Sequence, residues 1–581
     1  MIHKKRYIAT LAIGITSLLL IAPLSMHGSP KDGALDPSIP PRKASASTWK
    51  QLADISHRSE PQVRFGALLS PANKSQRPVE VIVGLKSPGS RRGVWKGRIL
   101  ISPTERDAVE SELAHMPGVS VLERDELPAV QITLYSPATF ERLRRQPWVD
   151  YVEPAYASAE LSSIGCTAPP PISNSTLDSS GDILPWNFPY HRIPEAWRRI
   201  ASGPHGGPGQ NVTIGVVDTG ILQGNTQLTM PQFAAGQSSG RQVINIATPT
   251  IFNPYTTCDH GNRVSALIGA PRDGINMEGI AWKSNLINVA SHTTVVVGHD
   301  EALSVVDGIR MAHTLGAQII TMAFGNHVVL GNLYLVGDTI RYEYYRTDLR
   351  PVLFVGAAGT TVCPFGATAY PGYLDEVIQV AGASEQHTPV YGESCYGESV
   401  DIAAVVGLGG IETAGAGPDQ YLGLGSSSGA TATIAGILAL IWSEHPTWSR
   451  DKVRDRLYAS AQGYRDPEMG WGVPDAFRAV GGLASLSING PKFLDELSQP
   501  YMLSANTGFA EGPFSYLWST GETTPTIHGI GPAKKLTPVT RTLRVTDTRD
   551  GTTLASTFTL RPEPTGRPCA REESDARICD H

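Results

Sequence analysis

The chain has 581 residues, which at about 150 residues per domain predicts several domains rather than one. Its 48 Lys and Arg against 54 Asp and Glu give a formal net charge of −6, and only 18% of the residues are charged, so nucleic acid is not an expected partner. The 59 Gly and 44 Pro, together with 41% hydrophobic residues, exclude a wholly disordered chain and a long coiled coil, and they indicate a globular protein rich in turns.

The amino terminus has the pattern of an export signal. Basic residues at 4–6 precede an uncharged apolar stretch that runs from Tyr7 to Leu24. This pattern predicts a signal peptide over 1–28, a secreted, cell-envelope or periplasmic protein, and no membrane contact once the signal is cleaved. No clean A-x-A site follows Leu24, so an uncleaved anchor is the alternative. Residues 29–77, rich in Pro, Ser, Lys and Arg, are predicted to form a linker.

Residues 78–158 have the texture of a small α+β unit. Ser102 and Glu105 surround Pro103 in the pattern of a capping box, which predicts a helix to about Met116, and a second helix is expected to start near 136. Strand-like apolar runs lie at 79–85, 119–123, 129–135 and 149–154. The resulting order β-α-β-β-α-β is typical of a ferredoxin-like unit.

Residues 161–482 alternate apolar strand-like runs with helical segments such as 301–315, which predicts an α/β domain with a parallel sheet flanked by helices. The clearest strands are expected at 212–218, 286–290, 318–324, 351–359 and 377–383. From 485 to 562 short strands and turn residues replace this pattern and predict a small β-sandwich. A charged tail, 563–581, holds two cysteines.

All six cysteines lie beyond residue 160, and an even number in an exported chain favours disulfides. Six cysteines allow 15 connectivities, and the sequence does not choose among them. Pairing of nearest neighbours would join Cys363 to Cys395 and Cys569 to Cys579, leaving Cys166 and Cys258. No CxxC pair and no HExxH motif occurs, so no metal site is predicted from these residues.

Three segments of the α/β region each place a reactive side chain at the end of a structural element. Asp218 follows the apolar strand VTIGVV, where active sites of parallel sheets gather. His260 precedes an apolar helical stretch, so a rigid frame would project its imidazole. Ser428 lies in a run of small residues that leads into another apolar helix, where backbone N–H groups are free to bind an oxyanion.

Together these segments resemble the subtilisin-like serine peptidases, the subtilases. VVDTG is similar to the family's Asp motif, DHGNRVSALI to HGTHVAG, and SSSGATATIAG to GTSMAAPHVAG. Weaker likenesses, from GIAWKSNLINV to GWGVPDAFRAV, extend the resemblance over about 185–480. The unit at 78–158, which ends in VDYVEPAYA, resembles the family's inhibitory propeptide, and 485–562 resembles Ig-like or PKD-like modules.

The resemblance implies a secreted serine endopeptidase, made as a self-inhibited precursor, with Asp218, His260 and Ser428 as its triad. Extended peptides would be its substrates, pairing with the strand formed by Ala323, Phe324 and Gly325, and its own propeptide would be an intramolecular inhibitor. The resemblance also implies a monomer that requires no cofactor. Structural calcium is allowed by the likeness, but no DxDxDG loop supports it.

Several positions depart from the family pattern. Thr360 stands where an Asn side chain would join the Ser428 N–H as an oxyanion donor, so reduced activity is expected. Arg263 replaces the second His of HGTHVAG, and Ala323 replaces a Ser.

Two alternatives follow from these residues. Thr360 supports a catalytically silent binding protein. The run from Gly425 to Gly429 also fits the G-x-S-x-G elbow of an esterase, in which Ser427 would be the nucleophile.

Overall fold

A computed structural model describes most of residues 79–562, with its longer gaps at 87–101, 155–165, 167–174, 229–239, 327–332, 415–420 and 532–537. The predicted signal peptide (1–28), the linker (29–77) and the tail (563–581) with Cys569 and Cys579 lie outside the described residues.

The amino-terminal unit is a four-stranded antiparallel sheet with two helices, and its strand order is β2-β3-β1-β4. Its elements follow the chain as β1 Val79–Leu85, α4 Pro103–Ala114, β2 Val119–Leu122, β3 Ala129–Leu134, α5 Pro137–Leu143 and β4 Val149–Pro154. Helix α4 begins with the capping box predicted from the sequence, because Ser102 Oγ accepts the Glu105 N–H and Glu105 accepts the Ser102 N–H. The unit has its own core, which includes Val83, Ile132 and Phe140.

The central domain is built on a seven-stranded sheet, in which all neighbouring strands pair in parallel with the order β15-β14-β13-β12-β7-β11-β9. The strands are β7 Thr213–Asp218, β9 Val243–Ala247, β11 Asn285–Ala290, β12 Ile319–Met322, β13 Leu353–Ala357, β14 Val377–Ala383 and β15 Ile402–Val405. Nearly continuous apolar runs form the inner strands because helices bury both faces of the sheet.

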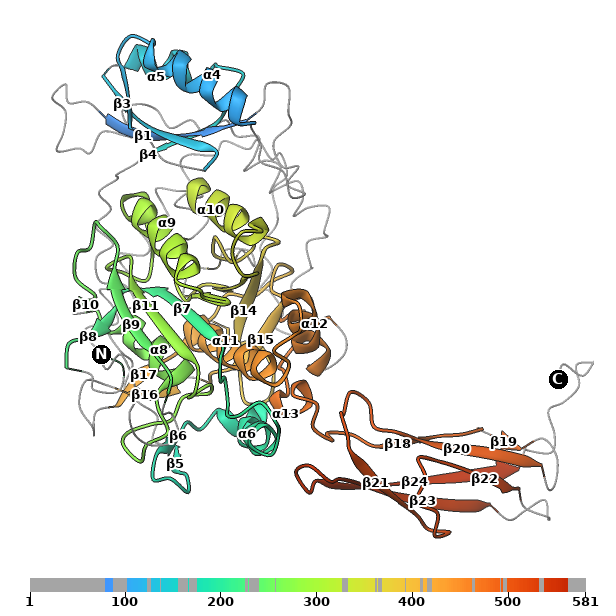
Figure 1. Cartoon of the computed structure of the whole chain (residues 1–581). Helices are drawn as coiled ribbons and strands as arrows, with labels where there is room; N and C mark the ends of the chain where they lie inside the picture. The colour runs from blue at the N-terminus through green and yellow to red at the C-terminus, as the bar shows by residue number, and fades with distance from the viewer. Residues whose placement is uncertain are drawn as a thin grey trace, which may run out of the picture. The chain divides into compact units, whose positions relative to one another are not determined.

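Helices cover the two faces of this sheet (Figure 1). One face packs against α9 His299–Thr314 and α10 Tyr334–Tyr345. The other packs against α8 His260–Gly269 and α11 Ser426–Glu444. Further helices of this domain are η1 Phe188–His191, α6 Ile193–Ala201, α12 Arg450–Ser460 and α13 Ala476–Ala479.

Helix α11 is the one helix of the described residues that is long and apolar enough to cross a membrane. Its residues from Ser427 to Glu444 are buried in the domain, as expected for the central helix of a protein core.

The predicted strands are present, but two of them are shorter than expected. The strand expected at 318–324 ends at Met322, and the strand expected at 351–359 is confined to Leu353–Ala357. Both end early because the chain leaves the sheet at the carboxyl ends of the strands. Beyond β12, Gly325 pairs with Val296 in an isolated parallel bridge instead of continuing the ladder.

Short paired strands surround this sheet: β5 Thr176–Leu177 with β6 Ile183–Leu184, β8 Ile221–Leu222 with β10 Tyr255–Thr256, and β16 Ile411–Ala414 with β17 Tyr421–Leu424. Two disulfides are formed among the described residues. Cys363 pairs with Cys395, as nearest-neighbour pairing along the sequence would have it. Cys166 pairs with Cys258, the two cysteines to which that scheme assigned no partner.

The carboxyl-terminal module consists of a three-stranded and a four-stranded sheet around a core that contains Trp518, Leu543 and Val545. The first sheet is formed by β18 Ser487–Asn489, β20 Pro500–Asn506 and β22 Thr526–Ile530. The second is formed by β19 Phe493–Leu494, β24 Thr553–Pro562, β23 Val539–Asp547 and β21 Phe514–Trp518.

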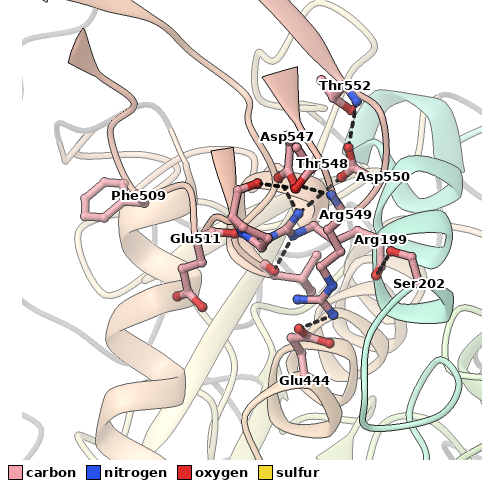
Figure 2. Close-up of polar contacts among 12 residues, drawn as sticks. Arg199, Ser202, Glu444, Phe509, Glu511, Asp547, Thr548, Arg549, Asp550 and Thr552 are labelled. Carbon is pink, nitrogen blue, oxygen red and sulfur yellow. Dashed lines mark hydrogen bonds and ion pairs between the residues drawn. The ribbon is translucent and has the colours of Figure 1, made fainter. Parts of the chain in front are cut away.

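A buried polar cluster joins this module to helix α6 (Figure 2). The Arg199 side chain is completely buried and forms ion pairs with Asp547 and, at 3.3 Å, with Asp550. Arg199 also donates to the backbone oxygen atoms of Val480 and Glu511. Buried charges are tolerated only when they are paired and hydrogen-bonded in this way.

Candidate functional site

Asp218 and His260 meet at the carboxyl end of strand β7. Asp218 is the last residue of β7, and His260 is the first residue of α8, which packs against that strand. Nδ1 of His260 lies 2.8 Å from Oδ1 of Asp218, and both residues are buried, with 3% and 1% of their surface exposed. The Asp218 carboxylate also accepts the backbone N–H of Thr219 at 2.7 Å.

The surroundings of Asp218 favour its charged form. Burial by itself would raise the pKa of the Asp218 carboxyl, but the nearby His260 and His292 rings and the Thr219 N–H hold that pKa below its ordinary value. Burial lowers the pKa of His292 to about 4, so this ring is neutral at pH 7. When a carboxylate accepts a hydrogen bond from the Nδ1–H of a neighbouring histidine, the proton stays on Nδ1. Nε2 of that ring is then free to act as a base.

Ser428 lies in the first turn of α11, two residues after Ser426, whose φ of 59° is in the left-handed region. Its side chain is buried, with 5% of the residue exposed, and its Oγ donates to the backbone oxygen of Ala323 at 3.1 Å. Nε2 of His260 has no hydrogen-bond partner among the described residues. The structure therefore joins Asp218 to His260 by a hydrogen bond, while the Ser428 hydroxyl is directed to Ala323.

The adjacent Ser427 is held in a different way. Its Oγ donates to the backbone oxygen of Gly359 at 2.9 Å and accepts the Gly359 N–H at 3.2 Å, and the residue is fully buried. These two bonds fix the hydroxyl between α11 and the loop after β13. Such a side chain has a structural role, and this geometry favours Ser428 over Ser427 as a nucleophile.

A cavity of about 20 Å³ lies beside Ser428. Thr360, which is half-buried, lines it together with residues of the segment Ala323, Phe324 and Gly325. Val295 and Val296, from the segment between β11 and α9, also line it. Thr360 and Ser428 therefore line the same small cavity, and the role of Thr360 as an oxyanion donor stays a prediction.

The backbone groups of Gly325 are already paired in this structure. Gly325 N–H donates to the oxygen of Val295, and the Val297 N–H donates to the oxygen of Gly325, both at 3.2 Å. The sequence had predicted that an extended substrate would pair with this segment. Binding of a substrate strand at Gly325 would therefore exchange these two hydrogen bonds for bonds to the peptide.

Three carboxylates outside this site, those of Asp178, Asp182 and Glu278, come within 4.8 Å of one another. The Arg272 guanidinium already forms ion pairs with two of them, Asp178 and Glu278, the second at 3.1 Å. A positive side chain thus supplies the charge that a cation would supply. The described residues of this cluster do not fit a calcium ion.

The model of the subtilase family matches residues 209–472, which contain Asp218, His260 and Ser428. With its seven-stranded parallel sheet, this region has a subtilisin-like α/β fold. The family match and the similar proteases described next support a subtilase, whose chemistry is that of a serine peptidase.

Several known proteases are similar to this chain. The M-protease of Shouchella clausii is 25% identical over 366 residues, covering 62% of this chain and 79% of the relative. The thermostable alkaline protease of Halalkalibacterium halodurans is 26% identical over 386 residues, covering 66% and 91%. Among solved structures, fervidolysin from Fervidobacterium pennivorans, described as a keratinolytic enzyme related to subtilisin, is 17% identical, with a TM-score of 0.49 and coverage of 84% of this chain and 76% of fervidolysin.

Four features of the site were not found by sequence reasoning. They are the second histidine next to Asp218, the pairing of Gly325, the structural role of Ser427 and the buried position of Arg263. His292 lies two residues after the strand-like run expected at 286–290, and this position near a strand end was its only signal in the sequence.

Proposed function

We propose that this chain is a serine endopeptidase that uses Asp218, His260 and Ser428 and forms an acyl-enzyme. The hydrogen bond between Asp218 and His260, at the carboxyl end of β7, carries this proposal. It gives the imidazole the orientation and tautomer in which Nε2 is a general base. Ser428 supplies a hydroxyl at the amino-terminal end of α11, where backbone N–H groups are not used within the helix.

The proposed reaction needs a small movement of Ser428. Its Oγ would turn from the Ala323 oxygen towards Nε2 of His260, lose its proton to that nitrogen, and attack the scissile carbonyl. His260 would then give the proton to the leaving amine, and water would release the acyl group by the reverse steps. Hydrogen bonds of this kind are often absent without substrate and form in the complex.

The proposed oxyanion site combines the Ser428 backbone N–H with Thr360, whose side chain lies at the same small cavity. A threonine hydroxyl is shorter than the amide of an asparagine and donates one hydrogen bond. We therefore expect a working but slow enzyme. Thr360 is also the observation that favours the second candidate, a catalytically silent protein that binds peptides on the same scaffold.

Contacts between the amino-terminal unit and helix α10 support an inhibitory propeptide. The Glu153 carboxylate, which is 2% exposed, accepts the backbone N–H groups of Tyr334 and Leu335 at 2.9 and 3.0 Å. Tyr151 donates to Asp338 at 2.9 Å and stacks on Tyr334. A negative charge at a helix amino terminus is favourable, so unit 78–158 would bind the peptidase domain through these contacts.

We also propose that the protein is exported, with 1–28 as its signal, and processed after the propeptide. The Cys166–Cys258 disulfide fits an oxidising location, and one similar protease of Bacillus subtilis is named as extracellular. After processing, this disulfide would keep Cys166 covalently linked to Cys258, two residues before His260.

The decisive experiment compares wild type, Ser428→Ala and Ser427→Ala by labelling with a fluorophosphonate and by hydrolysis of an extended peptide. We expect Ser428→Ala to lose all labelling and to reduce peptide hydrolysis by at least about 10³-fold, because it removes the nucleophile. Ser427→Ala is expected to keep labelling. Absence of labelling in a folded, processed wild-type chain would contradict the peptidase proposal and favour the silent protein, and loss only in Ser427→Ala would favour the esterase.

A further inference from the structure

Arg263 is a buried cation close to the proposed active site. It lies on α8, three residues after His260, and only 2% of it is exposed. Nη2 of Arg263 is 2.9 Å from Oδ1 of Asp259, and Nη1 donates to the backbone oxygen of Gly423 at 2.7 Å. A buried guanidinium is costly unless such partners satisfy it, so the two contacts strongly restrict where Arg263 and its neighbours lie.

The first partner belongs to the loop that carries His260. Asp259 directly precedes His260, and the backbone oxygen of Cys258 accepts the Thr219 hydroxyl at 2.9 Å. The Thr219 hydroxyl also accepts the Gly261 N–H at 3.0 Å. Arg263 therefore binds Asp259 in the segment around His260. The residues on either side, Cys258 and Gly261, bind Thr219, which directly follows Asp218.

The second partner belongs to the strand that leads to Ser428. Gly423 is in β17, which ends at Leu424 and is followed at once by the first turn of α11. Helix α8 packs against both β16 and β17. One side chain thus connects the segment that places His260 with the segment that places Ser428, two parts of the chain 160 residues apart.

The charge of Arg263 also reaches Asp218. Burial lowers the pKa of Arg263, whereas the negative charges of Asp259 and Asp218 oppose that change. Among the described residues, the titratable and charged groups near His260 are Asp218 at the end of β7, His292 after β11, and Asp259 and Arg263 on or next to α8.

We propose that Arg263 is a positioning residue, which holds His260 and Ser428 at the correct separation through Asp259 and Gly423. This inference rests on the serine peptidase proposed above, and Arg263 acts through these partners without touching the substrate.

The test compares Arg263→Met and Arg263→Lys with Arg241→Met. Arg241 is a matched control, because it is also 2% exposed and donates to the backbone oxygens of Gly269, at the opposite end of α8, and of Trp282, which precedes β11. We expect Arg263→Met to lower kcat about 10- to 100-fold with KM changed less than about 3-fold. Arg263→Lys should restore part of kcat, because it keeps the charge but not both contacts.

The melting temperature separates positioning from simple destabilisation. Arg241→Met should lower the melting temperature while keeping the kcat of wild type. Wild-type kcat in a folded Arg263→Met protein would overturn the inference.

Amide hydrogen exchange gives a result that does not depend on catalysis. Exchange at 258–262 and at 421–428 should increase together in Arg263→Met and remain unchanged in Arg241→Met. An unlabelled, inactive wild type would refute the proposed function, whereas this exchange pattern would still decide whether Arg263 connects the two segments. Increased exchange in one segment alone would overturn the connection.

Discussion

Thr360 is the residue whose chemistry departs most from the proposed mechanism. It lines the cavity beside Ser428 from the loop that follows β13, where a longer amide would reach further into the same space. Removing one oxyanion donor lowers kcat about 10²–10³-fold, a magnitude that was measured in subtilisin itself. If Thr360 is the oxyanion donor that we propose, its side chain limits kcat.

We predict that Thr360→Asn raises kcat for an extended peptide by about 10-fold or more, with little change in KM, because the added donor acts on the transition state. Steady-state kinetics on the two purified proteins measures this. Thr360→Ala is the companion variant and should lower kcat if the hydroxyl of Thr360 is a donor. Equal kcat values in all three proteins would show that this position does not bind the oxyanion.

At the scale of single elements, helix α10 has a partner outside the peptidase domain. The first two backbone N–H groups of α10, those of Tyr334 and Leu335, donate to Glu153 of strand β4. Asp338 of the same helix accepts a hydrogen bond from Tyr151. Hydrogen bonds to a charged group contribute about 1.5–3 kcal/mol each. This helix end therefore contributes to the attraction expected between the proposed propeptide and the central domain.

We predict that Glu153→Ala weakens propeptide inhibition by about 10-fold or more, because two backbone donors and a favourable charge at the helix end are lost. The measurement is the activity of the unprocessed precursor, made with Ser428 intact and followed from the start of folding. Glu141→Ala is the control, since Glu141 forms ion pairs with Arg144 and Arg145, which directly follow its own helix α5 in the amino-terminal unit. Equal latency of the two variants would contradict the role assigned to Glu153.

At the scale of the whole molecule, the buried ion pairs of Arg199 connect the carboxyl-terminal module to the central domain. Arg199 belongs to the peptidase domain, and its charge is balanced by Asp547 and Asp550 of the module (Figure 2). A second pair, Arg549 with Glu444, connects the module to the end of α11 at 2.5 Å. Because these charges are buried, removing the module would leave Arg199 without its carboxylates.

We predict that Asp547→Ala destabilises the folded chain by about 3–5 kcal/mol, because it leaves a buried guanidinium without its main partner. Urea unfolding measures this, and the transition of the peptidase domain should shift together with that of the module. The double variant Arg199→Met with Asp547→Leu should recover much of the loss, since no charge is left buried. Asp348→Ala, which removes an exposed partner of Arg346, should shift the transition far less.

Local patterns predicted the elements well, for identifiable reasons. The capping box at Ser102 predicted the start of α4, and the apolar run before Asp218 predicted a buried parallel strand. The strand runs were overestimated at both Gln318–Phe324 and Pro351–Gly359, because apolar residues continue beyond the point where the chain leaves the sheet. The small strands β16 and β17 have no comparable signal, since pairing and not periodicity defines them.

The sequence by itself determined the class of the central domain, the position of Asp218 at a strand end, and the positions of His260 and Ser428 at helix starts. These depend on local order, so a linear pattern records them. Only the tertiary structure decided which side chains meet: Asp218 with His260, Ser427 with Gly359, Arg263 with Gly423, and Arg199 with Asp547. Those contacts join segments far apart in the chain, and the packing of helices on the sheet is what brings them within hydrogen-bond distance.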